Sequence, residues 1–173
     1  MKEAYHLGVR DFAENRVEAA LLKMPQLPSD ITWHFIGPIQ SKKAAKIVQS
    51  FEFIHSIASL KTAELVAAWG EKLDKRPGLF LQVNTSGEKS KQGFTEEELL
   101  VSFSACSSLN IVGLMTMAPL TEDQEVIRSC FHRLACLGNN LKLPHLSMGM
   151  SHDFPIAIEE GATFLRIGSY LFQ

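Results

Sequence analysis

The chain has 173 residues, of which 46% are apolar and 21% are charged, and its formal net charge at pH 7 is −2. This length supports one sizeable core, so we expect residues 1–173 to form a single domain. The small negative charge excludes the strong positive field of a nucleic-acid-binding protein. No apolar run approaches the ~20 residues that cross a membrane.

The cysteines give an indication of the compartment. The chain has an odd number of cysteines, namely Cys106, Cys130 and Cys136. They lack the spacing of metal ligands, so no metal site is expected. The first six residues contain no apolar signal region. These features predict a cytoplasmic protein whose thiols are reduced.

Strand and helix patterns alternate along the chain, after a short helix that stops near Gly8. Strands are expected at 11–15, 31–37, 53–55, 78–84, 111–117, 144–146 and 163–167. Helices are expected at 16–24, 42–49 with Ser41 as its cap, 59–73, from Thr95 with a capping box, 122–137, 154–161 and, briefly, after Ser169.

This β-then-α order, repeated seven times, predicts a parallel sheet with helices outside it. Because the strands are largely apolar on both faces, we favour an α/β fold of the (β/α)8 TIM-barrel type. A doubly wound open sheet is the alternative. It is disfavoured because no glycine-rich turn follows the first strand.

Two small, hydroxyl-bearing turns are expected where the last two strands pass into helices. The first contains Ser147, Met148, Gly149, Met150 and Ser151, and the second contains Gly168 and Ser169. Backbone N–H groups at helix N-termini favour anions, and glycine allows a ligand to approach the backbone closely. In a barrel such a pair forms a phosphate cup after the last two strands. The alternative is a pair of ordinary turns with serine caps.

Arg166 is expected inside the apolar strand 163–167, where a buried guanidinium needs a partner because it does not lose its proton. A carboxylate elsewhere in the barrel would satisfy it. A ligand acceptor beside the phosphate cup is the alternative interpretation.

Other polar residues gather where the strands end, but each is a weak indication of function. His34 is more typical of a packed core histidine than of a chemical group. His55 and Ser56 are adjacent on a strand and should therefore point to opposite faces, which argues against a serine hydrolase. Lys42 and its neighbours on the basic helix are typical of a solvated face.

Several segments resemble the YggS/PROSC family of pyridoxal 5′-phosphate (PLP) homeostasis proteins. They are FAENRVEAAL, WHFIGPIQSKK, IHSIASL, LQVNTSGEKSKQGF, GLMTMAP, LSMGMSHDF and EEGATFLRIGSYLF. The resemblance implies a single-domain barrel like the N-terminal domain of alanine racemase. It also implies PLP held by a lysine Schiff base on the first strand, and no established catalytic turnover.

The resemblance also assigns roles to residues of this chain. Ser147, Met148, Gly149, Met150 and Ser151 would hold the phosphate, with Gly168 and Ser169 on its other side. Arg166 would face the pyridine nitrogen, and Asn15 would lie at the cofactor edge.

Some positions depart from the family pattern. Ala13 replaces a glycine, Pro38 a histidine, Lys42 an asparagine and Ala58 an aspartate. No residue matches the Schiff-base lysine, so we expect an N-terminally incomplete barrel that lacks its first strand. The alternatives are a truncated relative that binds PLP non-covalently, or one that binds nothing.

The resemblance therefore predicts a cytoplasmic, non-catalytic PLP carrier or regulator, with PLP-dependent apo-enzymes as possible partners and a monomeric full-length form. A PLP-dependent amino-acid racemase or decarboxylase is one alternative. A barrel enzyme that acts on a sugar phosphate is another, because the same cup would serve it.

Overall fold

The computed structural model describes residues 1–88 and 91–171. Its strands are β1 (Asp11–Glu14), β2 (Thr32–Phe35), β3 (Phe53–Ile57), β4 (Gly78–Gln82), β5 (Ile111–Met115), β6 (His145–Met150) and β7 (Phe164–Arg166). They form one sheet in the order β1-β2-β3-β4-β5-β6-β7, and every neighbouring pair is parallel. The predicted barrel order is confirmed. The doubly wound alternative is excluded because the strand order never reverses.

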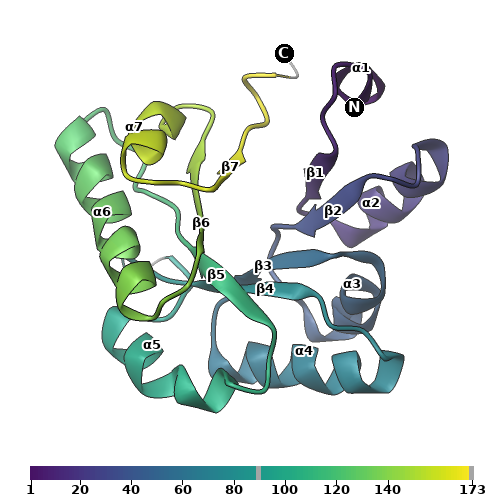
Figure 1. Cartoon of the computed structure of the whole chain (residues 1–173), viewed down its shortest axis with the longest axis horizontal. Helices are drawn as coiled ribbons and strands as arrows, with labels where there is room; N and C mark the ends of the chain where they lie inside the picture. Colours follow the sequence, from purple (N-terminus) through teal and green to yellow (C-terminus); the bar gives the residue numbers. More distant parts are fainter. Residues whose placement is uncertain (89–90, 172–173) are drawn as a thin grey trace.

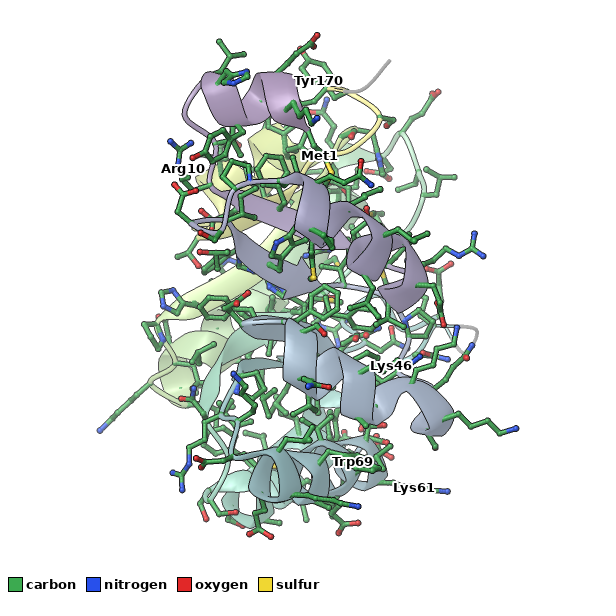
Figure 2. The ribbon with its side chains drawn as sticks, turned by 90° about the vertical axis from the view of Figure 1, so that its right-hand side faces the viewer. Met1, Arg10, Lys46, Lys61, Trp69 and Tyr170 are labelled. Atoms are coloured by element: carbon green, nitrogen blue, oxygen red, sulfur yellow. The ribbon has the colours of Figure 1, made fainter. Side chains whose placement is uncertain are left out.

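Helices cover the outside of the curved sheet, as Figure 1 shows. They are α1 (Lys2–His6), α2 (Val17–Lys23), α3 (Ala44–Ser50), α4 (Leu60–Leu73), α5 (Glu96–Ser102), α6 (Gln124–Asn140) and α7 (Phe154–Glu159), with 3-10 turns at Met24–Gln26, Ser41–Lys43 and Ser104–Cys106. Figure 2 shows Met1 and Tyr170 toward the same end of the molecule. Within the described ranges, no helix is both long and apolar enough to cross a bilayer.

Local capping explains where several helices begin. The predicted capping box of α5 is present, because Thr95 accepts from the Glu98 N–H while Glu98 accepts from the Thr95 N–H. Ser59 caps α4 in the same way through its hydroxyl. The predicted Ser41 cap is wrong: Ser41 lies inside a 3-10 turn, and its side chain makes no cap hydrogen bond.

The interior of the barrel is filled by stacked rings from several strands. His34 stacks on Phe53 at 4.8 Å between centroids, and His55 stacks on Phe80 at 4.1 Å. Phe164 of β7 reaches inward and lies 5.3 Å from Phe80. The interior is therefore a packed core, as expected for a barrel of this kind.

The ring of strands is not closed. Within the described residues, β1 pairs only with β2, and β7 pairs only with β6. Seven strands in series with two free edges agree with the expected eight-stranded barrel that lacks one strand.

The last two strand-to-helix units differ from the sequence-based expectation. Strand β6 does not end at Leu146 but continues through Ser147 to Met150, because the Ser147 side chain finds partners inside the barrel. The helix expected after Ser169 is only a turn up to Leu171, whose N–H donates to the Gly168 carbonyl at 2.9 Å. The rest of that expected helix, at Phe172, lies outside the described residues.

Candidate functional site

The turns that follow β6 and β7 meet at Ser151. The Ser151 hydroxyl oxygen accepts hydrogen bonds from the N–H groups of Gly168 and Tyr170, both at 3.2 Å. Ser169 is exposed between those two residues. The structure thus brings together Ser151, Gly168 and Ser169 at the carboxyl end of the barrel, where the phosphate cup is expected. Both hydrogen bonds are long, so these N–H groups can exchange partners.

Gly149 is needed for a reason other than ligand approach. Its φ is +92°, and a Cβ at this position would lie 2.6 Å from the Ala157 Cβ and 2.9 Å from Leu165 Cδ2. The pairing of β6 with β7 shifts register between Ser147 and Met150. Gly149 therefore allows a local irregularity that lets α7 and β7 pack closely on β6.

Asp153 is a buried residue that the sequence analysis missed. Its Oδ1 accepts from the Met150 N–H at 2.5 Å, and its side chain is fully enclosed. Among the described residues, Oδ2 has no hydrogen-bond partner, and the nearest basic group is His152 Nε2 at 3.4 Å. An aspartate just before the Phe154 helix start was a recognisable signal, since this residue type favours helix N-termini.

The Arg166 side chain extends from β7 toward β6 and the end of β5, and its guanidinium is hydrogen-bonded to neutral acceptors. Its Nη1 donates to the Ser147 hydroxyl at 2.8 Å, and its Nη2 donates to the Thr116 carbonyl at 2.7 Å. Burial lowers the pKa of the guanidinium to about 10, while the nearby charge of Asp153 acts in the opposite direction. No carboxylate among the described residues hydrogen-bonds to it, although the charge of Asp153 acts on it from nearby.

Ser147 does not face the cup. It is completely buried, and its hydroxyl lies 2.8 Å from His55 Nδ1 as well as accepting from Arg166. His55 Nε2 in turn lies 3.0 Å from His34 Nδ1, and His34 Nε2 lies 3.0 Å from Asp11 Oδ1. The predicted phosphate contact of Ser147 is thus replaced by a polar cluster inside the barrel.

Burial keeps both histidines of this cluster neutral. It lowers the pKa of His55 to about 2, with added repulsion from His34 and Arg166. The pKa of His34 is also lowered by burial, although the Asp11 carboxylate opposes the shift. Ser56 turns away from His55 and donates to the Gly37 carbonyl at 2.5 Å, so the two adjacent residues form no pair, as predicted.

The remaining predicted site residues do not converge on the cup. Asn15 is exposed just beyond β1, and its carbonyl packs so closely on Gly37 that a Cβ there would lie 2.0 Å from the oxygen. Met148 is fully buried within the hydrophobic core. Met150 is half-buried, and its backbone N–H is bound to Asp153.

A narrow cavity lies between the two free edges of the sheet. It has a volume of about 50 Å³ and is lined by residues of β1, β2, β3 and β7, including Asp11, His34, His55 and Arg166. The cavity therefore reaches four members of the buried polar cluster from this gap. Leu165 on the same edge is 38% exposed.

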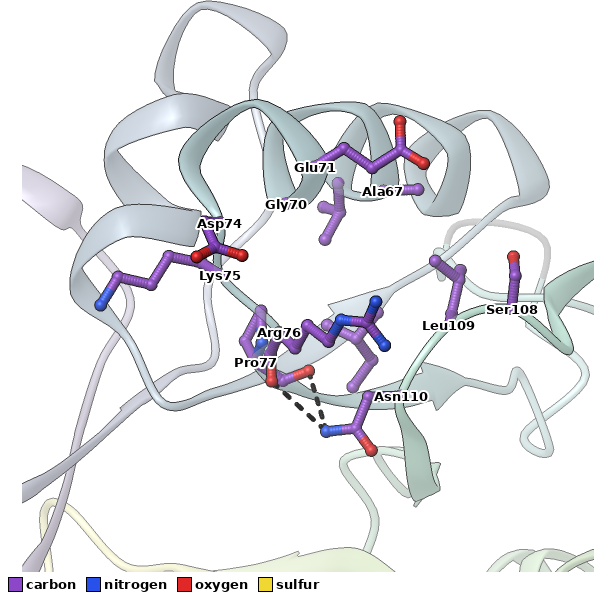
Figure 3. Close-up of a pocket in the computed structure, with 12 residues that line it drawn as sticks. Ala67, Gly70, Glu71, Asp74, Lys75, Arg76, Pro77, Ser108, Leu109 and Asn110 are labelled. Carbon is purple, nitrogen blue, oxygen red and sulfur yellow. Dashed lines mark hydrogen bonds between the residues drawn. The ribbon is translucent and has the colours of Figure 1, made fainter.

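A larger pocket, of about 330 Å³, lies near the amino ends of β4 and β5, beside the end of α4 (Figure 3). Asn110 there donates to the carbonyls of Arg76 and Pro77 at 3.4 Å. None of the predicted site residues lines this pocket. It lies at the opposite end of the strands from the cup.

Comparison with known proteins first gives the class. The family model described as "Alanine racemase, N-terminal domain" matches residues 1–173. Alanine racemase of Clostridium difficile has the same fold, with a TM-score of 0.80 at 13% identity over 99% of this chain and 49% of that chain. The chain is therefore a barrel of the alanine racemase N-terminal type.

Within that class, a curated relative from Synechocystis named "Pyridoxal phosphate homeostasis protein" is 42% identical over 99% of this chain and 84% of its own length. The solved structure of PipY from Synechococcus elongatus without PLP has a TM-score of 0.94 at 38% identity, covering 99% of this chain and 86% of PipY. PipY with PLP bound has a TM-score of 0.91 at 37% identity, covering 99% and 85%. The chain belongs to the family of pyridoxal phosphate homeostasis proteins.

Proposed function

We propose that this protein binds pyridoxal 5′-phosphate at the carboxyl end of its barrel and acts as a carrier or regulator of PLP, with no catalytic turnover of its own. The observation that carries the proposal is the environment of Arg166. Among the described residues, its guanidinium hydrogen-bonds to neutral acceptors only, at Ser147 and Thr116, so its positive charge has no hydrogen-bonded carboxylate and can be offered to a ligand. The naming of the Synechocystis relative and the PLP-bound form of PipY support the proposal.

The residues at the ends of β6 and β7 fit the parts of this cofactor. The N–H groups of Gly168 and Tyr170, now bound to Ser151, would turn to the phosphate, and the Ser151 hydroxyl would join them. Arg166 would donate to the pyridine nitrogen from inside the barrel. Asn15 would lie at the cofactor edge, on the neighbouring strand end.

Arg166 also explains why a carrier is a better proposal than an enzyme. PLP supplies an electron sink to enzymes, and this capacity is weaker when the pyridine nitrogen is unprotonated. A guanidinium donates a hydrogen bond but does not give up its proton, so the nitrogen it faces stays unprotonated. Delivery of PLP to PLP-dependent apo-enzymes would then be the role of a monomeric protein of this kind.

We further propose that the gap between β1 and β7 takes an additional parallel strand, and that this strand supplies the lysine for covalent attachment. Both facing edges carry unpaired backbone groups, and the Synechocystis relative extends beyond the matched region. Lys91, by contrast, is bound to the carbonyl of Ala118 at 2.8 Å, and Lys43 is paired with Glu18. Lys89, the other lysine of that loop, lies outside the described residues.

The binding proposal is tested by titration of the protein with PLP, followed by absorbance and by competition with inorganic phosphate. Saturable binding that phosphate competes away is expected. Arg166→Ala should weaken binding by about 1–3 kcal/mol, the usual range for a hydrogen bond to a charged group, and Arg166→Lys should recover part of it. Arg128→Ala, which breaks an ion pair of α6 with Glu159, is the matched control.

Two outcomes would contradict these proposals. If Arg166→Ala leaves binding untouched but lowers the melting temperature, Arg166 has a structural role only.

For the additional strand, borohydride reduction of this chain with PLP should label no single lysine stoichiometrically. A longer form that adds the upstream segment should give one dominant labelled lysine in that segment. Stoichiometric labelling of Lys42, Lys43 or Lys91 in the short form would show that one of these lysines forms the Schiff base with PLP instead.

A further inference from the structure

A continuous row of hydrogen bonds crosses the barrel from β7 to β1. It runs from Arg166 to Ser147 at 2.8 Å, to His55 at 2.8 Å, to His34 at 3.0 Å and to Asp11 at 3.0 Å. The five side chains come from β7, β6, β3, β2 and β1. We call this row the interior relay.

The two ends of the interior relay fix the position of every proton in it. The Arg166 guanidinium can only donate, and the Asp11 carboxylate can only accept. His34 therefore donates from Nε2 to Asp11 and accepts at Nδ1 from the His55 Nε2–H. His55 then accepts at Nδ1 from the Ser147 hydroxyl, whose oxygen accepts from Arg166. Both rings are neutral, with the proton on Nε2.

The reverse arrangement is costly because the middle of the relay is buried. Ser147 is fully enclosed, His55 is 2% exposed and His34 is 4% exposed, so no water replaces a lost partner. With the proton on Nδ1, His55 would direct an N–H at the Ser147 oxygen, and the serine proton would lose its acceptor. An unsatisfied buried polar group costs about 1–3 kcal/mol.

The charged groups near the two histidines are the ends of the relay and two further carboxylates. Arg166 lies beside His55 and Asp11 lies beside His34. The further carboxylates are Asp153, near Arg166, and Glu52, near His34. Asp11 is the end of the relay that meets solvent, with 64% of its side chain exposed. A proton added to His55 would place a second positive charge beside Arg166, so the neutral histidines leave Arg166 as the one positive charge among the five side chains of the relay.

We infer that His34 and His55 are positioning residues that, together with Ser147 and Asp11, fix the orientation of the Arg166 guanidinium through the single direction of the interior relay. This inference rests on the proposed function, in which Arg166 faces the pyridine nitrogen. The Thr116 carbonyl holds the other terminal nitrogen at 2.7 Å. Contacts from Ser147 on β6 and from Thr116, directly after β5, thus fix the plane of the guanidinium before a ligand arrives.

A packing role for the histidines makes the opposite prediction for two substitutions. His34 stacks on Phe53, so His34→Phe keeps a ring in place but removes both nitrogens. His34→Asn loses the ring, but its Oδ1 takes the place of Nδ1 and can still accept from His55. The relay predicts that asparagine preserves function better than phenylalanine, whereas packing predicts the reverse.

The first measurement needs no cofactor. Nitrogen-15 NMR of the free protein should show His34 and His55 as neutral Nε2–H tautomers between about pH 7 and pH 8. The Arg166 side-chain signals should broaden in His34→Phe and return in His34→Asn. Ser56→Ala, which removes a hydroxyl that is buried beside His55 but lies outside the relay, should change none of these signals. A charged or Nδ1–H form of His55, or Arg166 signals unchanged in His34→Phe, would overturn the inference.

The second measurement is PLP titration of the same variants. His34→Phe should bind about tenfold more weakly even if it melts no earlier, and His34→Asn should lie within about threefold of the unsubstituted protein. Equal binding by His34→Phe, or equal loss in both variants, would overturn the positioning role. If the unsubstituted protein does not bind PLP, the proposed function fails, and the Arg166 signals alone decide whether the relay positions Arg166.

Discussion

The turns after β6 and β7 share small residues and a place at the carboxyl end of the barrel, yet they are built differently. Strand β6 is paired on both sides, and α7 follows it after a turn closed by the buried Asp153. Within the part of the chain that the structure describes, strand β7 is paired on one side only, and it continues into an exposed turn. The turn after β6 is thus part of the core, whereas the turn after β7 is exposed and is held by its hydrogen bonds to Ser151.

The difference explains the two glycines. A Cβ at Gly149 would collide with Ala157 and Leu165, whereas a Cβ at Gly168 meets nothing within 4 Å. Gly149 therefore serves packing, and the open backbone at Gly168 is the part a ligand can approach. The same combination of glycine and serine therefore stabilises the core in the turn after β6 and leaves the backbone open to a ligand in the turn after β7.

The largest expected effect is that of an added methyl group at the two glycines. Gly149→Ala should lower the free energy of unfolding by about 2–4 kcal/mol, through overpacking and the positive φ. Gly168→Ala should change it by less than about 0.5 kcal/mol. Urea unfolding of both variants measures the difference. Equal effects at the two positions would remove the distinction between the turns.

Asp153 provides the next test of the β6 turn. Asp153→Ala should cost about 1–3 kcal/mol, because the Met150 N–H then lacks its acceptor. Asp153→Asn keeps an acceptor for that N–H and should cost clearly less. Thermal melting of the pair shows whether the hydrogen bond, rather than the charge near Arg166, stabilises this turn. A larger loss in the asparagine variant would favour the charge.

Acid should weaken the protein through its buried histidines. Below about pH 6.5 the unfolded chain binds protons on His34 and His55, whereas in the folded chain burial lowers the pKa of both, to about 2 for His55. Stability should therefore fall as pH decreases below about 6.5, by up to about 1.4 kcal/mol per pH unit for each histidine. Urea unfolding between pH 7 and pH 5 measures this slope, which should be shallower in His55→Phe.

The last test concerns the link between the turns, where only a small loss of stability is expected. Ser151→Ala frees the N–H groups of Gly168 and Tyr170 and should cost about 0.5–1 kcal/mol. Their hydrogen exchange should accelerate, while exchange at Met148 in the core of β6 should stay unchanged. Accelerated exchange in both strands would mean that the two turns unfold together.

The overall architecture could be predicted from the sequence because the alternation of strand and helix patterns is local. Parallel strands linked by outer helices follow from that alternation, and the capping box at Thr95 and Glu98 is visible in four residues. The burial of Arg166 was also predictable, since it is the one charged residue in its strand. Gathering Ser151, Gly168 and Ser169 at one end follows from the parallel order of β6 and β7.

The rest of the site depends on contacts between residues that are far apart in the sequence. Ser147 was assigned to a turn because serine and glycine are common there, but a partner 92 residues away draws it into the strand. The partners of Arg166 could not be deduced either, since a serine hydroxyl and a backbone carbonyl leave no charge signal. The position of Asp153 just before the Phe154 helix start is visible in the sequence, but its burial and its hydrogen bond to the Met150 N–H could not be deduced from spacing.

The strictly sequential strand order has a consequence for how the molecule assembles. Each strand pairs with its neighbour in the sequence, so the sheet can grow one unit at a time as the chain leaves the ribosome. The hydrogen bond between His55 and Ser147 is different, because it spans 92 residues and joins the first and last of the four strands from β3 to β6. The hydrogen bonds of the interior relay should therefore form late in folding, after the helices and the sheet have appeared.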